Sequence, residues 1–253
     1  MDGLVAQMNG LLESATGFQA RGNWDPPLFS SVDAADLTDL WLPKVHSLQH
    51  EELEKALRRL GSRSVVELGA ITRGKGTRTS EYSASGVPFL RTASLFGGGV
   101  EAIPTYYASA KDNCIVDELY PGDTLLSIEG RVGETFLAGS GVLMAWKNHI
   151  VRIRPTTGFD DLTRVQTGAW IYLFLRSFAG GEQIRRFTVI QSTIPAVAAR
   201  LYLVEIPAPN KTCSVAPRLS DQTLSAAHDW QSASAAIASI QLEAGAYFGT
   251  VTR

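Results

Sequence analysis

The feature that most constrains the fold of this 253-residue chain is a succession of short β-type segments between Ser64 and Pro155. They read VVELGAI, VPFLRT, TLLSIEG, ETFLAG, GVLMAW and HIVRIRP, and glycine or polar turns separate each from the next. In Tyr120 to Asp123 the Pro-Gly pair is typical of a tight turn that introduces the TLLSIEG strand. The pattern predicts a strand-rich module with many short connections.

A helical pattern precedes this module. Leu53, Leu57 and Leu60 recur at helical spacing, which predicts a helix from about Gln49 to Leu60, and Gly61 is suited to end it. Before it, residues 1 to 36 predict at most one short helix and an irregular stretch.

Two further helical patterns follow the module. After a polar break at residues 156 to 164, GAWIYLFLRSFAGGEQIRRF predicts a helix that ends at Gly180-Gly181 and continues as a basic turn. The tail predicts one helix of about six turns, with Asp221 as its N-cap and Gly245 at its end.

These patterns together predict an α/β protein of the α+β type, in which a strand-rich mixed domain lies between an N-terminal helical segment and a C-terminal helix. The expected parts are residues 1–62, an irregular or helical segment; residues 63–209, the strand-rich domain; and residues 210–253, a linker and helix.

Composition narrows the class of protein. Hydrophobic residues make up 45% of the chain, enough for a sizeable core, yet no stretch approaches the roughly 20 apolar residues of a membrane span. The N-terminus lacks the basic start and cleavage site of a signal peptide, so we expect a cytoplasmic protein. Cys114 and Cys213 are too few for a disulfide framework or a zinc site.

Motifs of known enzyme classes are missing from the sequence. It has no nucleophile elbow, Walker loop or dinucleotide fingerprint, and its four histidines show no metal-binding spacing. His46 and His50 are expected on a solvated helix face. Asp123 and Glu129 come nearest to a magnesium nuclease pattern, but no lysine follows Glu129, so turn and strand-end carboxylates explain them better. We expect no catalytic residue, metal or cofactor.

Cations and hydroxyl groups gather after the first strand. In RGKGTRTSEY the glycines let the backbone lie close to a surface, while the basic and hydroxyl side chains are the donors that phosphate oxygens prefer. Similar groups recur at Gln183 to Arg186 and at Gln191 to Thr193. Arg91 and Arg131 lie at strand ends, where a guanidinium can bind guanine through two hydrogen bonds. The alternative is that all of these are ordinary solvated loop residues.

Charge is distributed unevenly along the chain. The net charge is −2, but residues 63 to 200 hold 15 basic and 12 acidic residues, an excess of three. An excess this small favours polyanion binding only if the cations gather on one face.

Taken in order, these segments resemble the target recognition domain of the specificity (S) subunit of type I restriction-modification systems, or the equivalent C-terminal domain of a fused adenine-specific DNA methyltransferase. VVELGAITRGKGT is similar to the family's opening strand and loop, VPFLRTASL to its next strand and turn, and YPGDTLLSIEGRVGETFLAG to its hairpin. WKNHIVRIRP, IYLFLRSFAGGEQIRRF and QSTIPAVAARLYLVEIPAP continue the order. The resemblance covers about residues 63 to 209.

The resemblance implies a module that reads double-stranded DNA, has no catalysis of its own, and positions a methyltransferase subunit at an adenine in restriction-modification or related phage defence. It implies contacts to DNA from the following residues: Arg73, Lys75, Thr77, Arg78, Thr79, Ser80, Tyr82, Arg91, Ser94, Arg131, Lys147, Asn148, Arg185, Arg186, Gln191, Ser192 and Thr193.

Three arrangements stay open, because a complete S subunit has two such domains and this chain shows one. They are a half-size subunit that forms a homodimer, a recognition domain of a fused adenine methyltransferase, and a relative in another defence system. A different class also stays open: a protein-interaction or scaffold module that keeps the fold without reading DNA, which exposed Trp41, Trp170 or Trp230 would favour.

Overall fold

A computed structural model describes residues 1–16, 48–75, 82–83, 85–101, 106–108, 116–191 and 194–251. In this part of the chain the helices are α1 (Asp2–Thr16), α2 (Leu48–Arg59), α3 (Val65–Leu68), α4 (Arg164–Arg176), α5 (Phe178–Phe187), α6 (Pro209–Thr212) and α7 (Ala216–Val251). Short 3-10 turns occupy Thr92–Ser94 and Ala198–Leu203. None of the described helices is long and apolar enough to cross a membrane.

Two sheets carry the fold. The first has the antiparallel order β10 (Thr135–Leu137), β9 (Thr124–Ser127), β12 (Ile150–Pro155) and β2 (Gly69–Arg73). The second has the order β3 (Tyr82–Ser83), β7 (Tyr107–Ala108), β4 (Val87–Leu90), β11 (Val142–Trp146) and β8 (Val116–Leu119), with β4 and β11 parallel.

Three two-stranded pairs complete the described strands. They are β1 (Arg63–Ser64) with β15 (Glu205–Ile206), β5 (Leu95–Phe96) with β6 (Gly99–Val100), and β13 (Val189–Gln191) with β14 (Ile194–Ala196). The predicted α+β fold class is confirmed.

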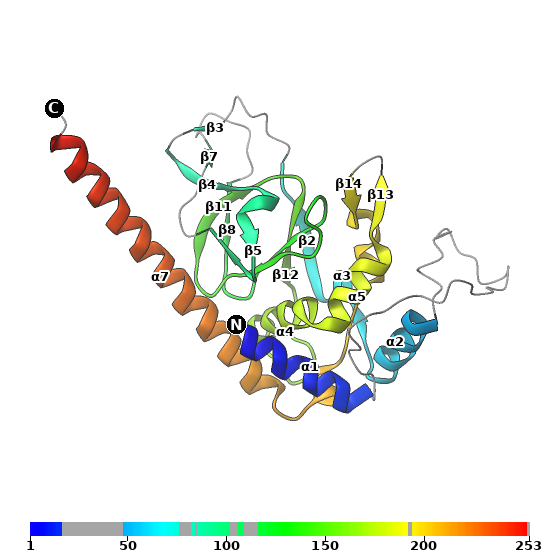
Figure 1. Cartoon of the computed structure of the whole chain (residues 1–253). Coiled ribbons are helices and arrows are strands. Elements are labelled where there is room, and N and C mark those ends of the chain that lie inside the picture. Colours follow the sequence, from blue (N-terminus) through cyan, green and yellow to red (C-terminus); the bar gives the residue numbers. More distant parts are fainter. Residues whose placement is uncertain are drawn as a thin grey trace.

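The first sheet lies between the helices and the second sheet, and the alternation of side chains along β12 shows why. Val151 and Ile153 point to one face and join the core cluster that includes α4, whereas Ile150 points to the other face and joins a cluster with Leu90 and Trp146 of the second sheet. In Figure 1, α1, α4 and α5 lie below the sheets. The strand-rich domain is therefore layered, with the first sheet at its centre.

Helix α4 forms the middle of the helical layer. Every residue from Thr167 to Leu175 is buried, and a helix that is apolar on all sides requires neighbours all round. It packs against α1, α5, α7 and the first sheet. Met8 and Leu12 of α1 and Leu219 of α7 belong to the same core cluster, so all three expected parts of the chain share one core.

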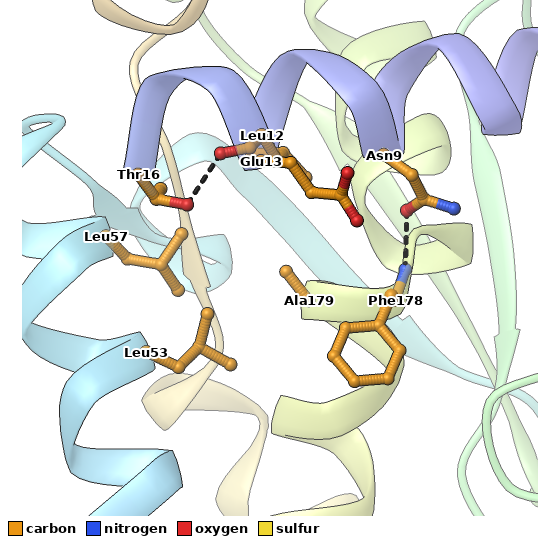
Figure 2. Close-up of a pocket in the computed structure, with 8 residues that line it drawn as sticks. All are labelled: Asn9, Leu12, Glu13, Thr16, Leu53, Leu57, Phe178 and Ala179. Atoms are coloured by element: carbon orange, nitrogen blue, oxygen red, sulfur yellow. Dashed lines mark hydrogen bonds between the residues drawn. The ribbon is translucent and has the colours of Figure 1, made fainter. Parts of the chain in front are cut away.

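The helix predicted from Gln49 to Leu60 is confirmed as α2, and its Leu53 and Leu57 are buried. Figure 2 shows these leucines facing Leu12 and Ala179 across a small pocket between α1, α2 and α5. At its edge the backbone N–H of Phe178 donates to Asn9 Oδ1 at 2.8 Å. Helix α1 is longer than the short helix predicted, because this junction buries one of its faces.

Two helix boundaries differ from the prediction. The break after α4 falls at Ser177, whose hydroxyl accepts the N–H of Gly180 and caps α5, so the Gly-Gly pair lies inside α5. A Cβ at Gly180 would lie 2.0 Å from the carbonyl oxygen of Phe174, so glycine permits close packing there and does not end a helix. The opening VVEL forms the single turn α3, and the strand starts at Gly69.

The C-terminal helix was predicted too short. Helix α7 starts at Ala216 and runs through both Asp221 and Gly245. Pro217 lies in its first turn, where a missing N–H costs nothing. Asp221, which was expected as the N-cap, instead accepts a hydrogen bond from Gln166 of α4 at 2.8 Å. This contact with α4 lies in the part of α7 where the local pattern had placed the start of the helix.

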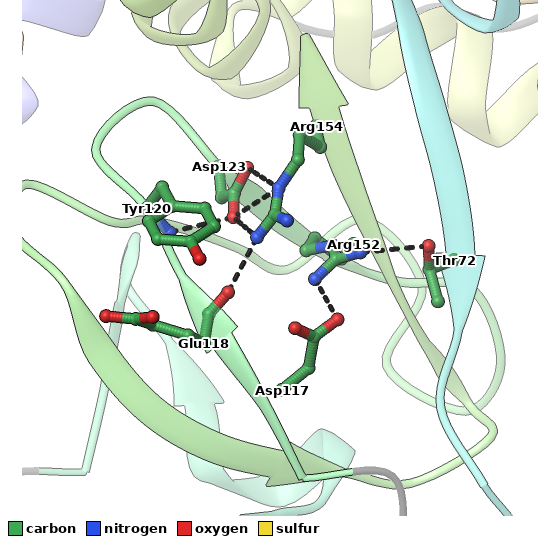
Figure 3. Close-up of polar contacts among 7 residues, drawn as sticks. All are labelled: Thr72, Asp117, Glu118, Tyr120, Asp123, Arg152 and Arg154. Atoms are coloured by element: carbon green, nitrogen blue, oxygen red, sulfur yellow. Dashed lines mark hydrogen bonds and ion pairs between the residues drawn. The ribbon is translucent and has the colours of Figure 1, made fainter. Parts of the chain in front are cut away.

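Two arginines of β12 join the sheets at their rim (Figure 3). Arg154 donates to both oxygens of buried Asp123, at 2.9 and 2.5 Å, and lies over the ring of Tyr120 at 4.4 Å. The hydrogen bonds that Arg154 donates to Asp123 raise the pKa of Arg154 above its ordinary value. Arg152, which is buried, forms an ion pair with Asp117 of β8. These pairs hold β12 against β8 and the turn before β9.

A second polar group joins α2 to α5. Arg186 is buried and binds Glu54 Oε2 at 2.9 Å, while His50 Nε2 lies 3.6 Å from Glu182 Oε2. Burial alone would raise the pKa of Glu182, but hydrogen bonds with His50 and Arg185 outweigh it and lower that pKa. His50 was expected on a solvated face and is instead buried; His46 lies outside the described residues.

Arg154→Met should lower the free energy of unfolding by about 3 kcal/mol, because it leaves the buried carboxylate of Asp123 without its charged partner. Urea denaturation measures this. Arg164→Met, at an exposed position of α4, removes the same charge and should change stability by less than about 0.5 kcal/mol. Equal losses in both variants would contradict the structural part assigned to the pair.

Glu182→Gln should cost about 2 kcal/mol near neutral pH, because hydrogen bonds to a buried charge are lost. A carboxylate with a lowered folded-state pKa contributes stability above its unfolded pKa, and this is lost as pH falls through the folded pKa. The difference between wild type and variant should therefore shrink as pH falls below about 4.5. Urea denaturation over a pH series checks this, with exposed Glu52→Gln as the control. A difference that grows in acid would contradict it.

Candidate nucleic-acid interface

Three strand ends bring three cations side by side. Strands β4 and β11 are parallel, with Leu90 paired to Trp146, so Arg91 and Lys147 follow at the same edge. Lys147 donates its N–H to the Leu90 carbonyl at 3.0 Å. Lys75 forms a parallel bridge with Lys147. Because neighbouring strands are about 4.8 Å apart, the three side chains start in one row.

Arg73 lies two residues before Lys75 and completes the set. We call Arg73, Lys75, Arg91 and Lys147 the cationic edge. All four are among the predicted contacts, and the structure brings them together from three segments of the chain.

Gly74 makes the row possible, because the chain passes from one sheet to the other at this residue. Arg73 still pairs with Val151 of the first sheet, whereas the N–H of Lys75 donates to the Trp146 carbonyl of the second at 3.1 Å. A Cβ at Gly74 would lie 2.2 Å from that carbonyl oxygen and 2.4 Å from the oxygen of Lys147. The glycines of this segment were expected to let the backbone lie close to a surface; at Gly74 the close approach is to the protein's own backbone.

Arg73 is held by its neighbours, although its side chain is 48% exposed. Its Nε donates to the carbonyl oxygen of Asn148 at 2.6 Å, and Nη2 forms an ion pair with Glu129 Oε1. The other carboxylate oxygen, Oε2, lies 3.2 Å from His149 Nε2. The sequence pattern did not predict this role for Glu129, because nothing local links residues 73, 129 and 149.

The hairpin from Glu129 to Gly133 lies beside the cationic edge. Gly130 and Gly133 have positive φ angles of 76° and 96°, which favour glycine. A Cβ at Gly130 would lie 3.7 Å from Thr92 Oγ1, and one at Gly133 would lie 3.7 Å from Ile184. The hairpin therefore lies between the turn after Arg91 and helix α5.

Exposed Arg131 is carried at the tip of this hairpin. The hydroxyl of Ser127 donates to the Arg131 carbonyl and accepts the N–H of Glu134 at 2.9 Å, which fixes the turn. Val197, which follows β14, donates its N–H to the Ile128 carbonyl at 2.9 Å. The β13–β14 segment thus lies next to the base of the hairpin.

Aromatic rings support the other end of the row. The guanidinium of Arg91 lies 4.0 Å from the ring centroid of Tyr106, and Tyr82 packs against the same ring at 4.7 Å. Such stacking restricts the arginine to one plane. Ser94 is buried, and its hydroxyl donates to Glu101 at 2.8 Å, so this side chain shapes the turn after Arg91.

The candidate residues on α5 differ in exposure. Arg185 is exposed and paired with Glu182 of its own helix. Arg186 is 7% exposed and bound to Glu54, so its guanidinium faces α2. Gln183, also buried, exchanges two hydrogen bonds of 2.9 Å with the backbone of Glu205. Of these three candidates on α5, only Arg185 is exposed.

The remaining predicted contacts are Gln191 and six residues outside the described ranges. Gln191 is the last residue of β13. Thr77, Arg78, Thr79, Ser80, Ser192 and Thr193 lie outside the described residues. Their contacts with DNA stay predictions.

Asp123 and Glu129, the two carboxylates of the nuclease pattern, do not converge on a common site; each is paired with an arginine. Asp123 is 1% exposed and bound to Arg154, while Glu129 is bound to Arg73, so each carboxylate has a cation as its partner. Within the described ranges, no group of three or more His, Cys, Asp or Glu residues could hold a metal ion. The described tryptophans do not favour the scaffold alternative, which called for exposed rings. Trp170 is fully buried and Trp230 packs on Phe136, while Trp41 lies outside the described residues.

Gly74→Ala should lower the free energy of unfolding by about 2 kcal/mol, because a methyl group there overlaps two backbone carbonyls. Gly10→Ala, on α1 with nothing within 4 Å of the added group, should instead raise it by about 0.5 kcal/mol. Thermal and urea denaturation of both variants check this. A neutral Gly74→Ala would show that β2 does not need to cross so closely.

No family model and no curated protein matches this chain. Solved structures are similar to it. The HsdS subunit from Thermoanaerobacter tengcongensis is 17% identical with a TM-score of 0.43, over 91% of this chain and 46% of that one. The type I restriction-modification S subunit from M. genitalium is 14% identical with a TM-score of 0.40, over 94% and 56%.

A third structure comes from work on complex assembly and conformational transition of the type I restriction-modification system. It is 17% identical with a TM-score of 0.44, over 99% of this chain and 50% of that one. This chain spans about half the length of each of the three. Two of these structural neighbours are S subunits, and all three come from type I restriction-modification systems, the family that the sequence segments resemble.

Proposed function

We propose that this chain is a sequence-specific double-stranded DNA recognition module of a restriction-modification or related phage-defence system. In this proposal it has no catalytic site of its own and positions a partner or fused adenine methyltransferase. The observation that carries the proposal is the cationic edge, in which Arg73, Lys75, Arg91 and Lys147 come from three separate segments to one surface.

The two kinds of cation suit two kinds of contact. Lysine is a point charge on a flexible stem, which suits Lys75 and Lys147 to phosphate oxygens and to affinity without sequence preference. Arg91 is stacked on Tyr106, and Arg73 is held by Glu129 and Asn148. A fixed, planar guanidinium can bind guanine O6 and N7 in parallel, which suits the arginines to reading bases.

Exposed Arg131 and Arg185 extend the surface on the side of the hairpin and α5. The close approach of Gly133 to Ile184 connects them to the cationic edge. Together these residues form a stretch of surface with positive charge and with groups that differ in rigidity. That combination supports DNA binding with specificity, as opposed to charge attraction alone.

Partners follow from the resemblance and from α7. The methyltransferase partner is inferred from the family. Past Gln231, which binds the backbone of Gly139, α7 runs away from the rest of the protein (Figure 1). Ile237 on this stretch is 47% exposed. A helical stretch that leaves the other described elements favours a second chain as its partner, and a homodimer would give the two-fold symmetry of a palindromic or bipartite site.

Selection from a pool of random duplex DNA, followed by fluorescence polarisation at several salt concentrations, tests the proposal. We expect one enriched motif and an affinity that falls steeply with salt. Salt-sensitive binding without a motif would reduce the function to non-specific attraction. Co-elution with a methyltransferase without any duplex affinity would favour the scaffold alternative.

Lys75→Ala should weaken binding to all sequences alike and reduce the slope of log affinity against log salt by about 0.9, because one phosphate contact is lost. Arg91→Ala should cost about 1–3 kcal/mol on the selected motif and relax one base position. Lys55→Ala, on α2, removes an equal charge from an exposed side chain and is the matched control. If all three variants behave alike, the surface is assigned wrongly.

A further inference from the structure

A carboxylate lies among the cations of the proposed DNA surface. Glu129 is 20% exposed, and both of its oxygens have a partner: Oε1 binds Arg73 Nη2, and Oε2 lies 3.2 Å from His149 Nε2. A negative charge at this place weakens attraction to phosphates. If this surface served only to attract DNA, a carboxylate at residue 129 would be unfavourable.

The geometry around Arg73 supplies a reason. Its Nε donates to the Asn148 carbonyl and its Nη2 to Glu129, so two acceptors on different segments hold one planar group. A guanidinium has five N–H donors, of which these contacts use two. The side chain is 48% exposed. Arg73 therefore offers remaining donors in a fixed orientation and has little side-chain freedom left to lose on binding.

Charge decides which acceptor such a group prefers. An arginine paired with a carboxylate keeps its hydrogen-bond donors, but the pair carries no net charge and gains little Coulomb energy from a phosphate. The N7 and O6 atoms of guanine are neutral acceptors, and binding them depends on donor geometry more than on net charge. The pair with Glu129 therefore shifts the preference of Arg73 from the DNA backbone toward a base edge.

We propose that Glu129 is a specificity-determining positioning residue, which holds Arg73 as a fixed reader of a guanine edge and prevents it from acting as a phosphate contact. The inference rests on the proposed function and adds that the residues of the cationic edge make different kinds of contact. Lys75 and Lys147 supply affinity there, and Arg73 with Glu129 supplies discrimination.

Glu129→Gln tests the inference, measured as the ratio of affinity for the selected duplex to affinity for a shuffled duplex of equal composition. We expect affinity for the shuffled duplex to rise and its salt slope to steepen by about 0.9, because Arg73 becomes free to bind a phosphate. The ratio should fall about tenfold, and a repeated selection should lose the preference at one guanine.

Glu134→Gln is the matched control, because it removes an equal charge from the residue that directly follows the hairpin. It should raise affinity for both duplexes alike and leave the ratio unchanged. Arg73→Lys keeps the positive charge but removes the planar guanidinium with its paired N–H donors. It should keep the affinity for the shuffled duplex within about twofold and lose the preference at the same guanine, even if Glu129→Gln should fold poorly.

Two outcomes overturn the inference while the proposed function stands: an unchanged ratio in Glu129→Gln and Arg73→Lys, or equal changes in Glu129→Gln and Glu134→Gln. A wild-type protein that selects no motif contradicts the proposed function itself, and with it this inference. The wild-type selection therefore separates the two failures.

Discussion

The passage of one strand between two sheets is the constraint on which the candidate interface depends. Residues 69–73 pair with β12 in the first sheet, and Lys75 pairs with Lys147 in the second. The backbone at Gly74 lies so close to two carbonyl groups that any side chain would have to displace them. This contact closes one edge of the sandwich and sets the position of the cations on either side of it.

The packing on both faces of the first sheet supports the edge at which Gly74 crosses. Apolar alternation along β12 gives the first sheet two buried faces, one against α4 and one against the second sheet. At the rim of the sheet interface, where an apolar contact would meet water, Arg152 and Arg154 form ion pairs with Asp117 and Asp123. The same chemistry that would bind a polyanion is used there to join strands, and burial distinguishes the two uses.

The cations of the proposed surface differ in how firmly their side chains are held. Arg73 and Arg91 are held by a carboxylate and an aromatic ring, respectively, while the lysines lie between them on flexible stems. Arg186 shows that a basic residue next to an exposed one on the same helix can face the interior, bound to Glu54. Proximity in sequence was therefore a poor guide to which cations could reach a ligand.

The sequence by itself determined the element types and the main apolar faces, because these depend on local periodicity: α2, the short strands and the turn at Pro121-Gly122 were predicted from it. It did not determine the ends of α5 and α7: Gly180 packs on the backbone of α4 from inside α5, and α7 runs through Gly245. Nor did it indicate that Glu129 would hold Arg73, or that Arg91, Lys147 and Lys75 would stand in one row. Those relations arise from the parallel pairing of β4 with β11 and from the crossing at Gly74, and a pairing between distant strands leaves no mark in the periodicity of either one.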